Sequence, residues 1–301
     1  MEHGCSDYGM LIYLSSCHLG NWDQKKVSHF SICVMGLGTI GLPTATYFQR
    51  AGYNVIGYDV SPKAVEKAQA HIEATTKING IPSDTEFFVI CVTTGLLGEK
   101  PDLSSVYDVC SKTSTFTPRL VSIESTIPVG VCRYIHETIF DSRINLSHFP
   151  HRYWPDDAER HGVAQLRVLG GINEESMQQA KKFYESLKIP WYAVDPIEIA
   201  EMTKVVENAY RYVQIAFAEE LRMICEKKNL DFSALRNSCN TKWNVDLPDA
   251  RDGIGGTCLP KDIRYLIDTA QEAARKPELL LAALEVDKNY RKHLLEALVY
   301  A

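Results

Sequence analysis

The sequence lacks the features that mark secreted, membrane-spanning and nucleic-acid-binding proteins. Its nine cysteines are odd in number and form no CxxC pair, which argues against a disulfide framework and favours a reduced, cytoplasmic protein. The longest strongly apolar runs, such as 87–92, are far too short to cross a bilayer. The formal net charge is −6 and no basic stripe stands out, so neither a nucleic acid nor an anionic membrane is an expected partner.

What is present is the composition of a globular protein. Of the 301 residues, 45% are hydrophobic and 23% are charged, and the length suggests about two domains. Residues 1–29 carry little pattern, so we expect an N-terminal extension there, as an extra edge strand or a disordered segment. A regular succession of strand and helix patterns begins at residue 30.

A glycine-rich turn follows the first strand pattern, 30–35. It has the sequence Gly36-Leu37-Gly38-Thr39-Ile40-Gly41 and leads directly into a helical pattern. In such a turn the first glycine permits a tight bend, the second lets a pyrophosphate approach the backbone, and the third lets the helix pack on the strand. The N–H groups at the helix N-terminus then face the phosphates. We therefore predict that Gly36, Gly38, Thr39, Ile40 and Gly41 bind a dinucleotide.

An acid at the end of the second strand pattern favours NAD over NADP. Asp59 follows the pattern 54–58, where its carboxylate would accept hydrogen bonds from the adenosine ribose and repel a 2′-phosphate. Further strand patterns occur at 87–92, 120–124 and 167–171. Together they predict an α/β fold with a doubly wound, mostly parallel Rossmann sheet.

Two threonines follow strands of this sheet at the edge where such sheets bind ligands. Thr94 comes after 87–92 and Thr126 after 120–124, so we predict that both contact the cofactor. Hydroxyls in such positions equally often cap the next helix, and that alternative stays open.

A long helical pattern begins near Asp195 and extends to about Lys228. Lys204 and Asn208 are four residues apart and share one face of it. Such a pair is usually solvated surface, but an ammonium and an amide aimed together can stabilise a developing oxyanion. Another face carries an apolar stripe, made of Met202, Val205, Ala209, Val213, Ala216, Phe217, Leu221 and Ile224.

The most specific segment is the glycine-rich loop 253–262. Pro260 is expected to begin a helix that extends to about residue 274, with Asp262 in its first turn. Cys258 then lies just ahead of a helix N-terminus with Lys261 nearby, and both features favour the thiolate form. This context predicts a nucleophile. Most cysteines are buried and inert, which is the interpretation we give to Cys33, Cys91 and Cys225.

These segments together resemble the nucleotide-sugar dehydrogenases, the group that contains UDP-glucose dehydrogenase and the UDP-N-acetylmannosamine and UDP-N-acetylglucosamine dehydrogenases. The resemblance extends from about Ser31 to the C-terminus. It rests on the cofactor turn, on 125–130, on the helix with Glu201, Lys204 and Asn208, and on 255–262. It implies an NAD-binding Rossmann domain at 30–194 and a central helical, dimer-forming domain at 195–301, which would make the protein a homodimer.

The resemblance also implies a reaction, the NAD-dependent double oxidation of a UDP-sugar C6 alcohol to the uronic acid. One hydride transfer gives an aldehyde, Cys258 captures it as a thiohemiacetal, a second transfer gives a thioester, and water releases the acid. In this scheme Lys204 and Asn208 hold the sugar oxygen and stabilise its negative charge. Asp262 orients Lys204 and the hydrolytic water, and Thr126 lies beside that water. Gly255 and Gly256 are expected to bind substrate.

The chain departs from the family pattern in three places. Where the family has a glutamate, this chain has His151, which either substitutes as an acid/base group or marks impaired thioester hydrolysis. Arg152 is expected to bind substrate, and the arrangement at 150–152 is closer to the acetamido-sugar enzymes than to UDP-glucose dehydrogenase. The stretch between Asp59 and 87 is shorter than usual. The family's second nucleotide-fold domain, which supplies much of the UDP pocket, has no counterpart in these 301 residues.

Two alternatives to a working dehydrogenase follow. One is a catalytically weak or non-enzymatic NAD-binding, dimeric remnant. The other is a β-hydroxyacid dehydrogenase, which shares the cofactor turn and a lysine–asparagine helix but needs no thiol. Cys258, Lys204, Asn208 and Asp262 together favour the UDP-sugar chemistry, and no metal is expected.

Overall fold

The computed structural model describes residues 12–13 and 31–299. The predicted extension 1–29 lies outside these residues, apart from a short strand, β1 (Ile12–Tyr13). The chain forms two compact units. We call them the sheet unit, which extends to Thr94 and resumes over Asp102–Glu201, and the helical unit, which comprises Gly95–Pro101 and the chain from Met202 onward.

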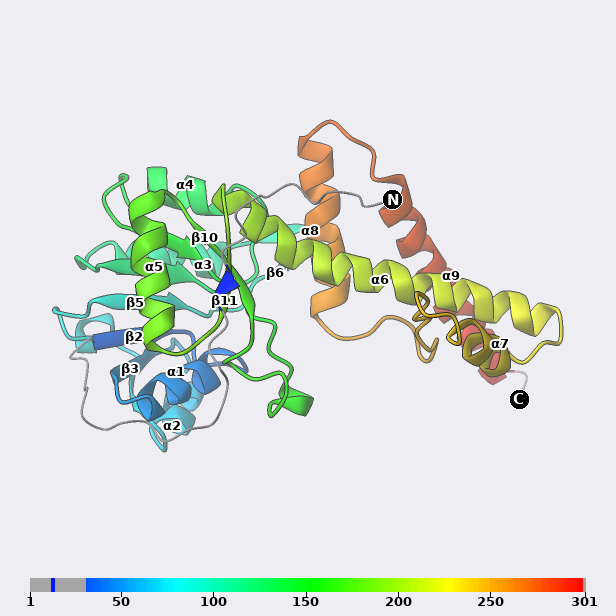
Figure 1. Cartoon of the computed structure of the whole chain (residues 1–301), viewed down its shortest axis with the longest axis horizontal. Coiled ribbons are helices and arrows are strands. Elements are labelled where there is room, and N and C mark those ends of the chain that lie inside the picture. The colour runs from blue at the N-terminus through cyan, green and yellow to red at the C-terminus, as the bar shows by residue number, and fades with distance from the viewer. Residues whose placement is uncertain (1–11, 14–30, 300–301) are drawn as a thin grey trace, which may run out of the picture. The chain divides into compact units, whose positions relative to one another are not determined.

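The sheet unit is built on a sheet of nine strands among the described residues (Figure 1). Their order is β1-β11-β10-β9-β8-β5-β2-β3-β4, and only the pairs β1–β11 and β9–β10 are antiparallel. This confirms the predicted mostly parallel α/β fold. The other strands are β2 (Ser31–Met35), β3 (Asn54–Tyr58), β4 (Glu73–Thr75), β5 (Phe87–Ile90), β8 (Leu120–Ile123), β9 (Leu146–His148), β10 (Arg167–Gly171) and β11 (Trp191–Val194).

Helices cover both faces of this sheet, and this explains why the central strands are apolar runs without alternation. Every residue of β5 and β8 is buried, as expected for strands that pack on helices on both sides. One face packs against α1 (Gly41–Arg50), α2 (Pro62–Ala68) and α5 (Glu174–Ser186). The other packs against α3 (Ser104–Thr113) and α4 (Val131–Thr138).

The helical unit consists of four helices and a hairpin among the described residues. The helices are α6 (Ile197–Lys227), whose first residues belong to the sheet unit, α7 (Phe232–Cys239), α8 (Cys258–Glu272) and α9 (Glu278–Val299). The hairpin of β6 (Gly95–Leu97) and β7 (Lys100–Asp102) is bound to α8, since the Tyr265 hydroxyl donates to the Gly95 carbonyl at 2.8 Å and Lys100 pairs with Asp268. No described helix is long and apolar enough to cross a membrane.

The predicted apolar stripe of α6 has two parts. Val205, Ala209 and Ala216 are buried, and the two alanines belong to the core of the helical unit. Met202, Phe217 and Ile224, in contrast, are 40%, 55% and 51% exposed, so three of the eight stripe residues face away from the core. The helix begins at Ile197 and ends at Lys227, within two residues of the expected bounds.

A buried acid lies on α6 where it faces α9. Glu219 is fully buried, and neither of its carboxyl oxygens accepts a hydrogen bond from any described residue. Burial, followed by the negative charge of Asp287, raises the pKa of Glu219 to about 8, although the Arg291 guanidinium acts in the opposite direction. At neutral pH, Glu219 is therefore a neutral carboxylic acid.

Replacing Glu219 by glutamine is expected to raise the free energy of unfolding by about 4 kcal/mol at pH 8. The folded protein keeps the Glu219 proton up to about pH 8, whereas the unfolded chain releases it near its ordinary pKa of 4.5. The wild type therefore loses stability as the pH rises between these values, and Glu219→Gln does not. Denaturant unfolding at about pH 5 and about pH 8 measures the difference. Glu220→Gln, an exposed neighbour, is the control, and parallel pH dependences of wild type and Glu219→Gln would contradict the assignment.

Candidate active site

The predicted site residues fall into two groups, one in each unit. The cofactor turn lies between β2 and α1 in the sheet unit, and its geometry excludes side chains at two positions. A Cβ at Gly36, whose φ is +97°, would lie 2.7 Å from the Cys91 carbonyl oxygen, and a Cβ at Gly41 would lie 1.7 Å from the Gly36 carbonyl oxygen. Gly38 is different, because no atom lies within 4 Å of its Cβ position. The backbone at Gly38 is therefore open to a ligand.

The structure around this turn fits the pyrophosphate of a dinucleotide. Ile40 is the N-cap of α1 and provides no side-chain cap. The Leu42 N–H donates to the Gly38 carbonyl at 3.2 Å and Pro43 has no N–H, so in the first turn the Gly41 N–H remains for a phosphate oxygen. A groove of about 820 Å³ runs from Gly38 and Thr39 to the start of α2, and Arg50, Lys63 and Lys67 line it with positive charge. Its size and charge suit a large anionic ligand.

Asp59 follows β3, as predicted, and its carboxylate is bound by the backbone on both sides. One oxygen accepts a hydrogen bond from the Leu37 N–H at 2.7 Å and the other from the Ser61 N–H at 2.8 Å. The acid thus joins the glycine turn to the start of α2. In this structure its first role is to hold the edge of the groove.

The two predicted threonines lie together after neighbouring strands. The Thr94 hydroxyl, after β5, donates to the Thr126 carbonyl, after β8, at 2.9 Å. The turn that carries Thr126 is held by Glu201 of α6, whose carboxylate accepts from the Gly130 N–H at 2.6 Å and the Cys132 N–H at 2.7 Å. Burial raises the pKa of Glu201 to about 7 in spite of these two donors. Glu201 therefore caps α4, which has no cap of its own.

His151 is buried rather than open to substrate. Its ring nitrogen Nε2 pairs with the Glu124 carboxylate and lies 3.2 Å from the Thr44 hydroxyl of α1. Glu124 in turn accepts from the Arg167 guanidinium at 3.0 Å and from the Tyr184 hydroxyl at 2.7 Å. Burial alone would raise the pKa of Glu124, but Arg167 and His151 outweigh it and hold the pKa at about 2.

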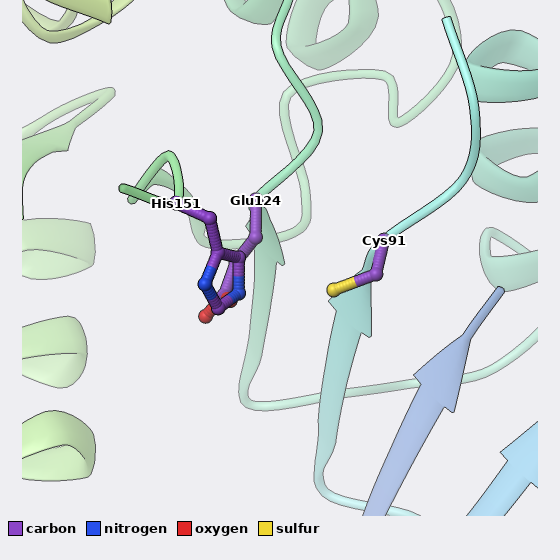
Figure 2. A group of neighbouring side chains, drawn as sticks. All are labelled: Cys91, Glu124 and His151. Atoms are coloured by element: carbon purple, nitrogen blue, oxygen red, sulfur yellow. The ribbon is translucent and has the colours of Figure 1, made fainter. Parts of the chain in front are cut away.

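This cluster carries the ligand types of a metal site. Figure 2 shows the side chains of Cys91, Glu124 and His151 extending toward one another, and their ligand atoms lie within 4.8 Å of one another. Two observations speak against a cation. Burial raises the pKa of the Cys91 thiol well above its ordinary value, and the Arg167 guanidinium already neutralises Glu124. We therefore assign no metal there. The burial of Cys91 agrees with the inert role expected for it.

Arg152, the neighbour of His151, is half-buried in the sheet unit. Its guanidinium donates to the Leu166 carbonyl at 2.9 Å, so this bond fixes the segment between β9 and β10.

In the helical unit, Cys258 is the first residue of α8, whereas the sequence predicted a helix start at Pro260. The helix extends two residues further because its N-cap, Thr257, already has helical backbone angles. Cys258 is exposed, and its sulfur lies 3.8 Å from the Thr257 hydroxyl. The thiol is therefore accessible at the end of a helix where N–H groups point outward.

Asp262 connects α8 to α6. It is fully buried, and its carboxylate accepts from the Asn208 amide at 2.5 Å and pairs with the Lys261 ammonium at 2.6 Å. The orientation of Lys204 by Asp262, which the family resemblance implied, is not seen: Asp262 binds Asn208, and Lys204 has no hydrogen bond or ion pair with any described residue. The Lys204 ammonium is therefore available to a ligand.

The glycines before Cys258 leave the loop open. Neither Gly255 nor Gly256 has an atom within 4 Å of its Cβ position, and the φ of +77° at Gly256 favours glycine.

Sequence reasoning missed Glu124 and Arg167 as a functional pair. A signal was present, because Arg167 is a charged residue at the start of an otherwise apolar strand run and is fully buried. A buried arginine needs a carboxylate partner. The sequence does not reveal which acid supplies it.

Two models of one family match most of the chain. They are the NAD binding domain of the UDP-glucose/GDP-mannose dehydrogenase family, over residues 67–188, and its central domain, over residues 198–289. The NAD binding domain of the D-isomer specific 2-hydroxyacid dehydrogenases also matches, over residues 13–95.

Named relatives show the same likeness. The UDP-N-acetyl-D-mannosamine dehydrogenase of Methanococcus maripaludis is 30% identical, with 93% of this chain and 69% of the relative covered. The NDP-N-acetyl-D-galactosaminuronic acid dehydrogenase of Ralstonia nicotianae is 31% identical, with 88% and 70% covered. The solved structure of UDP-D-ManNAc dehydrogenase from Pyrococcus horikoshii matches with a TM-score of 0.81 at 28% identity, over 90% of this chain and 72% of that one.

The fold and the domain matches define an NAD-dependent nucleotide-sugar dehydrogenase. The chain belongs to the UDP-glucose/GDP-mannose dehydrogenase family, and NAD is its cofactor. It spans about two thirds of the length of the relatives that it matches.

Gly38→Ala is expected to fold normally and to weaken NAD binding by tenfold or more, on the order of 1.4 kcal/mol. Its Cβ would meet no protein atom, so only the bound pyrophosphate would be displaced. Calorimetric titration with NAD, together with a thermal melt, measures both effects. Gly41→Ala is the contrasting variant, since its Cβ would collide with the Gly36 carbonyl and lower the melting temperature. If Gly38→Ala folds and binds NAD with unchanged affinity, the assignment of this turn to the cofactor site is wrong.

Proposed function

We propose that this chain oxidises the C6 alcohol of a UDP-sugar to the carboxylate in two NAD-dependent steps. The observation that supports this most directly is an exposed cysteine at the first position of α8, one turn from the Asp262 carboxylate that binds Asn208. A simple alcohol dehydrogenase needs no such thiol. An enzyme that passes through an aldehyde to an acid uses one to form a covalent acyl intermediate.

Each proposed residue has a defined part in the reaction. NAD, when bound, accepts a hydride in each of the two oxidations. Lys204 and Asn208 hold the C6 oxygen and stabilise its negative charge as the alcohol loses its proton to solvent water and its hydride to NAD. The Cys258 thiolate adds to the aldehyde carbon, and the resulting thiohemiacetal loses a second hydride to become a thioester. Water then attacks the thioester carbon, which releases the carboxylate and returns the thiolate.

The sheet unit supplies the cofactor site in this proposal. Gly36, Gly38, Thr39, Ile40 and Gly41 bind the pyrophosphate, and Asp59 binds the ribose. Thr94 and Thr126 lie along the same edge of the sheet. The assignment is supported by the open backbone at Gly38, by the uncapped N-terminus of α1 and by the positively charged groove.

His151 has a structural role in this proposal. Its ring is buried against Glu124 and Thr44, so it stabilises the core beneath the glycine turn instead of activating water. With His151 in this position, Asp262 and Thr126 are the residues proposed to orient the hydrolytic water. The alternative is that the thioester is hydrolysed slowly. Gly255 and Gly256 provide the open backbone that a substrate would approach, and Arg152 is proposed as a further substrate contact.

The substrate we propose is a UDP-N-acetylhexosamine. The named relatives act on N-acetylated sugars, and UDP-glucose is the alternative. A second candidate function is an NAD-binding dimeric protein without turnover. It is favoured by the burial of His151 at the position where the family has a glutamate. We also keep a cytoplasmic location as a prediction, in agreement with the seven free thiols among the described residues.

A homodimer is proposed from an exposed apolar row on α6, which includes the three exposed residues of the predicted stripe. Met202, Val206, Tyr210, Phe217 and Ile224 are between 39% and 62% exposed along one helix. An apolar row of this length on a soluble domain marks an interaction surface.

Cys258→Ala is expected to abolish formation of the uronic acid while leaving NAD affinity unchanged. The wild type should release two NADH per sugar from one or more members of a panel of UDP-sugars, read by absorbance, with the acid identified by mass spectrometry. Cys239→Ala, another thiol of the helical unit, is the matched control. Normal acid production by Cys258→Ala would rule out covalent catalysis, whereas a wild type that binds NAD and turns over no sugar would favour the remnant.

Phe217→Glu is expected to convert the dimer to a monomer, because a charge in the apolar row opposes its burial. Light scattering coupled to size exclusion measures the mass. Leu97→Glu, which places the same charge on the exposed hairpin residue, should leave the dimer intact. If the wild-type protein has the mass of a single chain in this measurement, the proposal of a homodimer is wrong.

A further inference from the structure

The loop that leads to Cys258 is bound to α9 by a buried acid. Asp287 is 8% exposed, and one of its carboxylate oxygens accepts a hydrogen bond from the Ile254 N–H at 2.8 Å. The other accepts from the Tyr212 hydroxyl of α6 at 3.0 Å. One carboxylate therefore holds the loop to two helices of the helical unit.

Arg291, one turn further along α9, completes the contact. Its Nε lies 3.1 Å from both Asp287 oxygens, and its Nη2 donates to the Ile254 carbonyl at 2.6 Å. Both backbone groups of Ile254 are thus bound by one ion pair. Gly253 permits this, since its φ is +85° and a Cβ there would lie 2.8 Å from the Arg291 guanidinium carbon.

Between Ile254 and Cys258 the described part of the chain provides no comparable support for the loop. Upstream, Arg222 donates to the Ala250 carbonyl and Tyr290 to the Arg251 carbonyl. Downstream, Gly255 and Gly256 have open space around them, and the residues up to Cys258 are exposed. The Ile254 contact is therefore the last firm attachment before the thiol.

Charge makes this attachment specific to Asp287. The groups that face it are Tyr212 and Glu219 from α6 and Arg291 from its own helix. Among the described residues, the Arg291 guanidinium is the cation that pairs with the Asp287 carboxylate. An amide in its place would keep the shape but lose the ion pair and one acceptor.

We propose that Asp287 and Arg291 are positioning residues for Cys258: they fix Ile254 and thereby hold the flexible glycines so that the thiol stays at the first turn of α8. The inference rests on the proposed role of Cys258 as nucleophile. Neither residue touches the reacting atoms. Asp287 and Arg291 influence the position of the thiol through the backbone of 253–257. A small displacement of a reacting group lowers the rate of reaction considerably.

The test compares Asp287→Asn and Arg291→Ala with Glu285→Gln, which removes a carboxylate from an exposed pair with Lys288 on the same helix. Three quantities are measured on the whole chain. They are amide hydrogen exchange of the peptide 250–258, the rate of Cys258 alkylation by iodoacetamide resolved by mass spectrometry, and kcat and KM for NAD with the UDP-sugar that the wild type accepts. Circular dichroism checks that each variant folds.

We expect both variants to exchange faster in 250–258 alone and to lose about tenfold or more in Cys258 alkylation rate and in kcat, with KM for NAD unchanged. Glu285→Gln should match the wild type, and Arg291→Lys, which keeps the charge, should recover part of the loss. If Asp287→Asn does not fold, Arg291→Ala tests the positioning role. The Arg291 side chain is 44% exposed, so its removal is expected to leave the fold intact.

Unchanged alkylation in variants whose loop exchanges faster would overturn the positioning role. Unchanged exchange would overturn the attachment itself. If the wild type turns over no UDP-sugar, the proposed reaction fails, while exchange and alkylation still decide whether Asp287 positions the thiol.

Discussion

The helical unit depends on one buried carboxylate. Asp262 lies out of contact with water, and an ionised carboxylate in that position is tolerated only when cations and donors surround it. Lys261 supplies the charge and Asn208 the donor, so the acid fixes the first turn of α8 against the middle of α6. A displacement of α8 would separate the Asp262 carboxylate from Asn208, whereas Lys261 lies on α8 itself and would move with it. The start of α8, where Cys258 lies, is therefore held to α6 by the Asp262–Asn208 contact, and the loop before it is held to α9 at Ile254.

The sheet unit also contains a buried carboxylate that is surrounded by cations and donors, and here it supports the cofactor edge of the sheet. Beneath the glycine turn, Glu124 is surrounded by Arg167, His151 and Tyr184, and this buried network lies where strands β5 and β8 end. The turn above it leaves no room for side chains at Gly36 and Gly41. A rigid polar layer below and a backbone without side chains above give the cofactor edge a fixed shape before any ligand arrives, so little ordering remains to be done on binding.

The strands and the glycine turn of the sheet unit were predicted well, because each is recognised from a short run of neighbouring residues. The strands 54–58 and 167–171 were located residue for residue, and the turn 36–41 was identified from its glycines, the flanking strand and helix patterns and the acid that follows. What sequence could not show depends on contacts between distant residues. The pairing of His151 with Glu124 and the attachment of Ile254 to Asp287 each connect different elements. The start of α8 was misplaced for a local reason, since a proline two residues inside a helix resembles a proline at its first position.

The hairpin of β6 and β7 has a consequence for how such proteins diversify. Its sequence lies between two strands of the sheet, yet it belongs to the helical unit through Tyr265 and Asp268. Neither unit is thus encoded by one uninterrupted stretch of gene. A crossover near residue 195 would separate the hairpin from the helix that binds it and leave the Gly95 carbonyl without its donor. Recombination between relatives is therefore expected to transfer the two units together, and new specificities are expected to arise by point substitution within them.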